Sequence, residues 1–197
     1  MRGFLRVVVG VGGLVVGGGA VWGADVPSGP KAGVGVPALR AYGVVGLVEG
    51  KEADWAAVRR DGVTVYVWVA AEESGVPKGG RPAARFLKAL DEEIGKWEGA
   101  AVVAVWWGEK AVGPLPAAEA HKGYLPRFQE SLRLQRTSLA VYGGEGSGPA
   151  EWGIHPQAAV TVVVANQGRV VRSLGYESVN ETAVKDVVEV LKGVRQR

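Results

Sequence analysis

The chain has 197 residues, the size of one domain, and its 47% hydrophobic content with seven tryptophans argues against disorder of the whole chain. The net charge is +3, and it falls to +1 if residues 1–24, which carry Arg2 and Arg6 but no acid, are removed. Such a charge gives no electrostatic case for a nucleic-acid partner. Cysteine is absent, which excludes disulfides, thiolate metal sites and thiol redox chemistry.

The amino terminus has the layout of a secretory signal peptide. Arg2 and Arg6 precede an apolar, glycine-rich stretch, and Gly23 or Ala24 supplies the small residue after which such a peptide is cleaved. We therefore predict a signal peptide over residues 1–24 and a secreted or periplasmic location. The alternative is an uncleaved leader that anchors the protein in the membrane, although its many glycines make it a poor membrane helix.

Residues 25–39 are rich in proline and glycine and are predicted to form a flexible linker, so the folded domain should cover residues 40–197. Within it, apolar β-branched runs predict strands, and apolar residues at three- and four-residue spacing predict helices. The first strands predicted in this way cover 42–48, 63–70, 101–107 and 139–142, and the helices cover 53–60, 82–97 and 125–136. Trp55 and Val58 should face inward from the first helix.

The carboxyl-terminal part has the clearest pattern. Residues 160–165 predict a strand buried on both faces, and Asn166, Gln167 and Gly168 predict a tight turn into a second strand over 169–175. Ser178 lies three residues before Glu181, the spacing of a capping box, so a helix should start near Val179. Its apolar face is predicted to consist of Val184, Val187, Val188, Leu191 and Val194.

This order of elements, alternating strands and helices followed by a ββα unit, resembles the thioredoxin fold, in particular its thiol-disulfide oxidoreductase and peroxiredoxin-like branches. Two motifs carry the resemblance: Trp152, Gly153 and Ile154 before a strand, and Asn166-Gln167-Gly168 after it. The resemblance covers about residues 40–195. It implies an α/β fold, namely a thioredoxin-like three-layer α/β/α sandwich with a mixed central sheet and a carboxyl-terminal ββα unit.

The chain departs from these families where their redox chemistry takes place. In the redox-active families, the loop after the second strand holds one or two cysteines, but here it holds Glu72, Glu73 and Ser74. The cis-proline that faces those cysteines would fall on Ala159 or Val160. We therefore expect neither thiol oxidoreductase nor peroxidase activity.

Two sets of residues remain as candidate sites. Glu72, Glu73 and Ser74 could perform hydrolytic or acid/base chemistry, although adjacent side chains on an exposed loop usually point into water. Trp106 and Trp107 should point to opposite faces of their strand. A groove for a peptide or a sugar is predicted from the residues Trp106, Trp107, Trp152, Ala159 and Val160, because a tryptophan at a strand end often exposes a ring edge.

We expect no metal and no cofactor. The two histidines, His121 and His155, lack the further ligands that a zinc site needs. The function predicted from the sequence is a redox-inactive thioredoxin-like domain of an exported protein that serves as a binding or scaffolding module, with a protein or peptide partner in the cell envelope. Alternatives are a non-redox enzyme using Glu72 to Ser74, or a structural domain tethered to the membrane through an uncleaved leader.

Overall fold

The computed structural model describes residues 26–72, 76–108, 123–144, 146 and 148–195. Its strands are β1 (Arg40–Val45), β2 (Glu52–Asp54), β3 (Val63–Ala70), β4 (Ala101–Trp107), β5 (Thr137–Val141), β6 (Val160–Asn166) and β7 (Arg169–Tyr176). Its α-helices are α1 (Trp55–Val58), α2 (Gly80–Ile94), α4 (Tyr124–Leu132) and α5 (Val184–Arg195), and two short 3₁₀ helices are η1 (Ala150–Trp152) and η2 (Glu181–Ala183).

The described strands form one mixed sheet of seven strands in the order β2-β1-β5-β4-β3-β6-β7. The three central strands β3, β4 and β5 run parallel, and β6 and β7 follow antiparallel on one side. Val65 in β3 lies opposite Val102 in β4 and Val164 in β6, so β-branched side chains pack along the middle of the sheet. The α/β fold with a mixed central sheet and a ββα end is confirmed.

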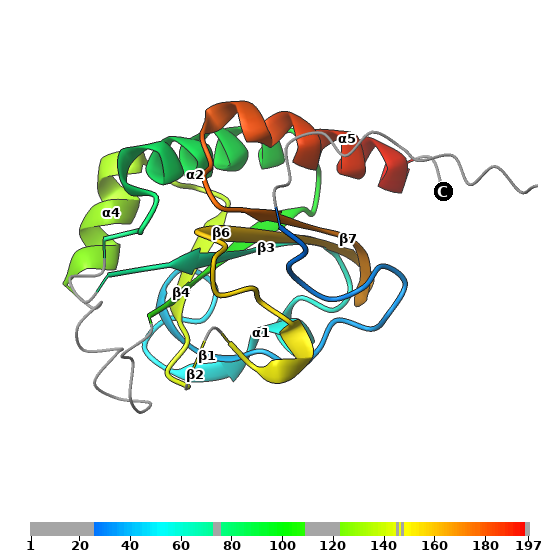
Figure 1. Ribbon diagram of the computed structural model, residues 1–197, viewed down its shortest axis with the longest axis horizontal. Helices are drawn as coiled ribbons and strands as arrows, with labels where there is room; N and C mark the ends of the chain where they lie inside the picture. The colour runs from blue at the N-terminus through cyan, green and yellow to red at the C-terminus, as the bar shows by residue number, and fades with distance from the viewer. Residues whose placement is uncertain (1–25, 73–75, 109–122, 145, 147, 196–197) are drawn as a thin grey trace, which may run out of the picture.

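The two faces of the sheet are covered differently (Figure 1). Helices α2, α4 and α5 lie together over one face, where Phe86, Leu90 and Leu191 are fully buried. On the opposite face, the described elements are the short helix α1 and η1, together with the irregular amino-terminal segment, and the core there is rich in aromatic rings. In the described residues, the second helical layer therefore consists of single turns. Trp106 packs in the core under the helices and Trp107 in the opposite core, as predicted.

The predicted flexible linker is wrong for residues 26–36, which we call the strap. The strap lies along the outer edge of β7: the Val26 N–H donates to the Gly175 carbonyl at 3.3 Å, and the Gly33 N–H to the Val170 carbonyl at 2.7 Å. Proline and glycine were interpreted as signs of flexibility, but here they shape a covering for an otherwise open edge strand. The packed part of the chain thus begins at least as early as Val26, before the predicted boundary at residue 40.

The start of the last helix also differs from the prediction. The Asn180 side chain, not that of Ser178, caps this end: its Oδ1 accepts hydrogen bonds from the Thr182 N–H at 2.9 Å and the Thr182 hydroxyl at 2.6 Å. Glu181 forms an ion pair with Arg85 in α2 instead of closing a capping box. A 3₁₀ turn therefore precedes α5, which begins at Val184. Its predicted apolar face is confirmed, with Val184, Val187 and Leu191 buried.

The first helix is shorter than predicted. Asp54 caps α1 by accepting from the Ala56 N–H at 3.1 Å, and the helix is only four residues long. Trp55 is buried as predicted, but Val58, the last residue of this single turn, is 43% exposed and does not face inward as predicted. The first strand ends at Val45, and the chain folds back as β2, a second antiparallel strand that the sequence pattern did not indicate.

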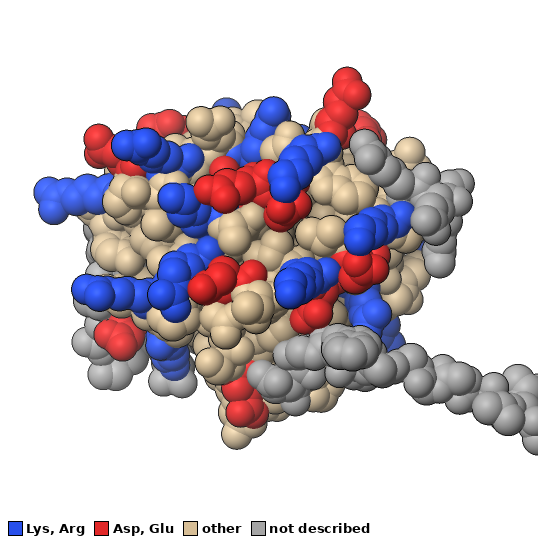
Figure 2. All heavy atoms as spheres, turned by 90° about the horizontal axis from the view of Figure 1, so that it is seen from above, with Lys and Arg blue, Asp and Glu red and all other residues tan. Residues whose placement is uncertain are grey.

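The turn between β6 and β7 is confirmed, with positive φ angles at Gln167 (47°) and Gly168 (69°). On the helical face, acidic and basic side chains lie interspersed, as Figure 2 shows. This is the mixed charge of an ordinary solvent-facing surface. None of the helices in the described residues is long and apolar enough to cross a membrane. The predicted leader, residues 1–24, lies outside the described residues.

Candidate functional site

The parallel strands β3, β4 and β5 all end on the same side of the sheet, at Ala70, Trp107 and Val141. We call this side, formed by the carboxyl ends of the strands, the carboxyl edge. Open α/β sheets place their ligands there. The loop after β3 closes on itself there. The Glu72 N–H donates to the Val76 carbonyl at 2.9 Å, and the Lys78 N–H donates to the Ala70 carbonyl at 2.8 Å. This loop is also tied to β4, because the Ala71 N–H donates to the Trp107 carbonyl at 2.8 Å.

Of the predicted acidic candidates, Glu72 is exposed to solvent, and Glu73 and Ser74 lie outside the described residues. Their convergence into a pocket is therefore untested, and the hydrolytic hypothesis stays a prediction. The loop leads into α2, which starts at Gly80 without a side-chain cap or an acidic residue in its first turn.

The segment before β6 faces this loop, at the position where the redox families place a cis-proline. No cis peptide bond occurs in the described residues, and the Ala159 carbonyl accepts a hydrogen bond from the Ala70 N–H at 3.0 Å. Ala159 is half-buried and Val160 is buried. The Ala159 carbonyl is thus engaged within the protein and is not offered to an extended peptide.

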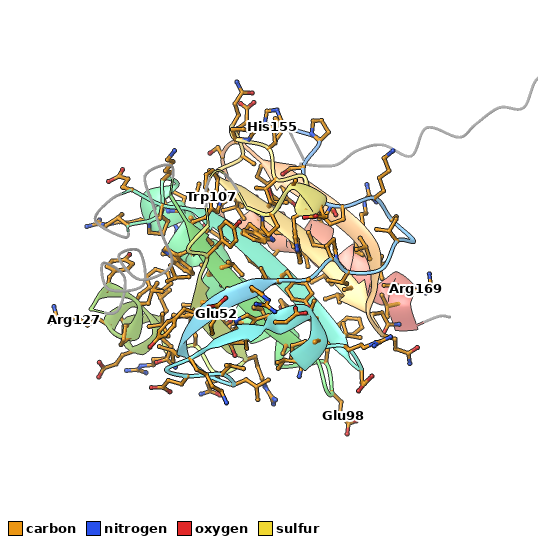
Figure 3. All side chains as sticks on the ribbon, turned by 90° about the horizontal axis from the view of Figure 1, so that it is seen from below. Glu52, Glu98, Trp107, Arg127, His155 and Arg169 are labelled. Atoms are coloured by element: carbon orange, nitrogen blue, oxygen red, sulfur yellow. The ribbon has the colours of Figure 1, made fainter. Side chains whose placement is uncertain are left out.

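The tryptophans of the predicted groove do not have the exposed edges on which that prediction depended. Trp106, Trp107 and Trp152 are each no more than 2% exposed. Their rings fill the cores on the two faces of the sheet because this domain has few helices to supply apolar side chains on one face. As the described structure stands, these rings are packing elements and form no open groove. Figure 3 shows Trp107 on the same side of the molecule as His155, and far from Glu98, which precedes β4.

An aromatic cluster lies on the face opposite the helices. Trp68 packs against Trp152 with ring centroids 5.2 Å apart and against Tyr142 at 5.8 Å. Trp152 in turn packs against Tyr66 at 5.3 Å. The loop after β5 covers Trp68 with backbone, since a Cβ at Gly148 would lie 3.0 Å from Cζ3 of its ring. Tight packing of this kind excludes water from the centre of the cluster.

The polar ends of these aromatic side chains fall into two groups. Three have carbonyl partners: Trp55 Nε1 donates to Ala41 at 3.1 Å, Trp152 Nε1 donates to Ala38 at 3.0 Å, and the Tyr66 hydroxyl donates to Trp55 at 3.5 Å. The indole N–H groups of Trp68 and Trp107 are buried and have no hydrogen-bond partner among the described residues. Both unpaired donors come from the ends of β3 and β4 nearest the carboxyl edge.

On the face opposite the helices, burial and nearby charged groups change the pKa of Tyr66. Burial raises the pKa of Tyr66 to about 12, with Asp54 also raising it and Arg59 lowering it.

At the carboxyl edge, the Lys78 ammonium lies over the Trp107 ring, 5.9 Å from its centroid. Hydrogen-bond donors and positive charge therefore meet at this edge.

A separate cavity of about 430 Å³ lies between the carboxyl-terminal ends of α2 and α4. Asp91 at its base accepts hydrogen bonds from the Gln135 and Arg136 N–H groups, at 3.0 and 2.8 Å, and from the Thr137 hydroxyl at 2.7 Å. Lys88 and Arg133 also line it, and Arg133 caps the carboxyl-terminal end of α4, where a cation is favoured by the negative end of the helix dipole. We interpret this cavity as a structural clamp between α2 and the chain leading into β5.

Sequence reasoning missed Trp68 and Lys78 as members of this edge. Trp68 sits inside a run of buried-strand type, which signals packing alone, and Lys78 sits in a loop of mixed composition. The available signal was that a buried indole N–H usually needs a partner. In the described residues, no group of three His, Asp or Glu side chains could hold a metal ion; His121 lies outside those residues.

No protein-family model matches the sequence, and a search of curated proteins found no match. Solved structures do match. A yeast mitochondrial 1-Cys peroxiredoxin is similar at 14% identity and a TM-score of 0.55, covering 84% of this chain and 78% of that one. A secreted thiol-disulfide isomerase from Corynebacterium glutamicum is similar at 15% identity and a TM-score of 0.54, with 87% of this chain and 96% of that chain covered. The peroxidoxin BcpB from Mycobacterium tuberculosis is similar at 16% identity and a TM-score of 0.53, with 84% of this chain and 98% of that chain covered.

At these identities the similarity concerns the fold. The neighbours combine peroxiredoxin-like and thiol-disulfide oxidoreductase structures, the two branches that the sequence motifs indicated. The loop after β3 closes through its own backbone and has no sulfur. The protein thus has the thioredoxin-like fold of peroxiredoxin-like and thiol-disulfide oxidoreductase structures, in a chain without cysteine.

Proposed function

We propose that the protein is an exported, redox-inactive thioredoxin-like module that binds or scaffolds a protein or peptide partner in the cell envelope. The observation that carries this proposal is the absence of cysteine from a sequence that folds as a thiol oxidoreductase does. The thiolate is the nucleophile in that chemistry, and no other side chain replaces it in thiol-disulfide exchange. What the fold retains is a closed edge at the ends of its parallel strands.

Export is supported by the basic and apolar pattern of residues 1–24 and by the secreted description of one structural neighbour. Mass spectrometry of the protein from its own cells tests it. We expect an amino terminus at Ala24 or Asp25 in the envelope or medium fraction. An intact Met1 in the soluble interior fraction would refute export, and an intact leader in the membrane fraction would instead favour the tethered alternative.

Redox inactivity is tested by insulin-reduction and peroxide-consumption assays, with a cysteine-containing thioredoxin as positive control. We expect rates equal to those without protein. Robust turnover of either substrate would overturn the proposal, because it would require a redox group that the sequence does not provide.

Partner binding is tested by crosslinking and capture from the envelope fraction with two charge-reversal variants. Lys78→Glu changes the carboxyl edge, and Glu98→Lys is the matched control on the opposite side of the molecule (Figure 3). Both side chains are exposed, so neither change should unfold the domain. We expect one partner to be captured by the wild type and by Glu98→Lys, and at least about tenfold less by Lys78→Glu, equivalent to about 1.4 kcal/mol. Equal capture by both variants would place the partner elsewhere.

A further inference from the structure

In the part of the chain that the structure describes, two buried side-chain donors lack hydrogen-bond partners, and both lie at the carboxyl edge. The indole N–H groups of Trp68 and Trp107 are unpaired, whereas those of Trp55 and Trp152 on the same face each reach a backbone carbonyl. Orphaned indoles are therefore not a general consequence of how this face packs. Within residues 26–195, apart from the segments left undescribed, they occur where β3 and β4 end.

The two donors belong to one place in the sheet. β3 and β4 are adjacent and parallel, with Trp68 opposite Val105 and Trp107 opposite Ala70. The two tryptophans are thus diagonal neighbours, two register positions apart, and both pack in the core opposite the helices. Both side chains therefore come from the carboxyl-terminal part of the two strands, the end of the sheet where open α/β folds place their ligands.

Leaving a donor buried and unpaired costs about 1–3 kcal/mol in a folded protein. Phenylalanine would supply most of the same apolar surface without this cost, so two unpaired donors side by side call for a physical reason. A hydrogen-bond acceptor that binds at this edge supplies one. When such an acceptor is bound, it pairs both indole N–H groups and removes the free-energy cost of leaving them unpaired.

The chemistry around the donors specifies the acceptor. An indole N–H only donates, and the Lys78 ammonium, 5.9 Å from the Trp107 ring centroid, adds positive charge. Two donors and a cation fit the two oxygens and the negative charge of a carboxylate. Because both rings are almost fully buried, the entering group must be small and must use a local opening of the edge.

We propose that Trp68, Trp107 and Lys78 form a binding site for a carboxylate group, carried by a small organic acid or by a polypeptide partner. This inference rests on the proposed binding function and gives its ligand a chemical class. The indole N–H groups are the hydrogen-bond donors of the site, and Lys78 attracts the charge.

The experiment follows the indole N–H signals of the ¹⁵N-labelled full-length chain, which has seven tryptophans. Trp68→Phe and Trp107→Phe assign two of these signals by their disappearance. We expect sodium acetate to shift those two signals downfield in a saturable way, with sodium chloride at equal ionic strength as the control. The signals of Trp55 and Trp152, which already have partners, should stay in place.

Each Phe variant should weaken acetate binding about 10- to 100-fold, because a buried hydrogen bond to a charged group is worth about 1.5–3 kcal/mol. Lys78→Gln, an exposed change that leaves the core intact, should weaken acetate binding and leave binding of neutral acetamide unchanged. A tripeptide with a free carboxyl terminus, compared with its amidated form, then distinguishes a polypeptide carboxylate from a small acid. Tighter binding of the free tripeptide than of acetate favours the polypeptide.

Acetate shifts no larger than those with chloride, or equal shifts in all indole signals, would overturn the site and leave the two donors to ordered water. That failure is distinct from failure of the proposed function. Capture of a partner by Trp107→Phe at the wild-type level would keep the binding module and remove only the carboxylate site. Thiol turnover would remove the proposed function whatever the indole signals do.

Discussion

The face of the sheet opposite the helices contains two regions that treat their polar groups in opposite ways. Near the strap, the Ser28 hydroxyl lies 2.6 Å from the Thr161 hydroxyl and accepts a hydrogen bond from the His155 N–H at 2.9 Å. At the carboxyl edge, Trp68 and Trp107 keep buried N–H groups without partners. Ser28, Thr161 and His155 are thus joined by hydrogen bonds near the strap, whereas the two indole donors lack partners among the described residues.

The difference separates structure from function. A segment that closes an edge strand has no reason to leave donors unpaired, and the strap is held by the hydroxyl of Ser28 and by the Ser173 hydroxyl, which donates to the Pro30 carbonyl. Natural proteins break such local rules mainly where a site requires it. The strap has therefore to be tested as a stabilising element, and the carboxyl edge as a place where stability has been given up for binding.

The largest expected effect on this face is at high pH, through Tyr66. Its pKa is raised from 10.0 to about 12, chiefly by burial, so the folded protein holds this proton to higher pH than the unfolded chain does. The resulting stability is complete below pH 10 and is lost as the pH rises to about 12. Two pKa units correspond to about 3 kcal/mol.

Urea unfolding of the wild type and Tyr66→Phe across this pH range measures the effect. The variant lacks the titrating hydroxyl, so it should lose about 3 kcal/mol less than the wild type between neutral pH and pH 12. If the free energy of unfolding falls equally in the two proteins, Tyr66 is open to solvent. The aromatic cluster would then not be tightly packed around it.

The second effect concerns the strap. A Cβ at Gly175 would lie 2.4 Å from the Val26 carbonyl oxygen and 2.6 Å from Cβ of Ser28, so Gly175→Ala should push the strap off β7. Overpacking of this kind costs about 1–3 kcal/mol. Hydrogen exchange should show loss of protection at the Val26, Gly33 and Val36 amides, which donate to this edge, while the helical face stays protected.

Gly193→Ala in α5 is the matched control, because nothing lies within 4 Å of a Cβ at that position. It should stabilise the protein by about 0.5–1 kcal/mol, the usual gain of alanine over glycine in a helix. If Gly175→Ala is as harmless as this control, the strap is not a fixed part of the fold.

The sequence was sufficient for the elements whose signal is local. The strand at 160–166 and its turn follow from β-branched residues and from Gly168, and α5 follows from the spacing of its valines. The strap was mistaken for a linker because its order comes from β7, about 140 residues away, and proline and glycine give no sign of that partner.

The candidate site could be predicted only in part, for a related reason. The motifs place it at the end of β3, since the order of strands fixes that edge, and this placement stays a prediction. They could not tell which tryptophans have partners. Trp152 and Trp68 have the same side chain, and only the position of the Ala38 carbonyl, more than 100 residues from Trp152, makes one satisfied and the other not.

The third effect is smaller and concerns the hydrogen bonds that Ser28 of the strap forms with Thr161 and His155. Ser28→Ala removes the partner of the Thr161 hydroxyl and of the His155 N–H, which should cost about 1–2 kcal/mol. Thr161→Val removes the other hydroxyl. If the two hydroxyls bond each other, the double variant should be about 1 kcal/mol more stable than the sum of the single losses predicts. Additive losses in chemical denaturation would mean that each hydroxyl is bonded elsewhere.

The smallest expected effect distinguishes the tryptophans that have hydrogen-bond partners from those that lack them. It uses four matched Trp→Phe substitutions on the face opposite the helices. Trp55→Phe and Trp152→Phe each lose a hydrogen bond and leave a backbone carbonyl without its donor. Trp68→Phe and Trp107→Phe lose similar volume but no hydrogen bond. In buffer without carboxylates, the second pair should therefore be less destabilised than the first by about 1 kcal/mol, measured by urea unfolding. Equal losses in all four would mean that the Trp68 and Trp107 N–H groups have partners in solution, and the two regions would then not differ.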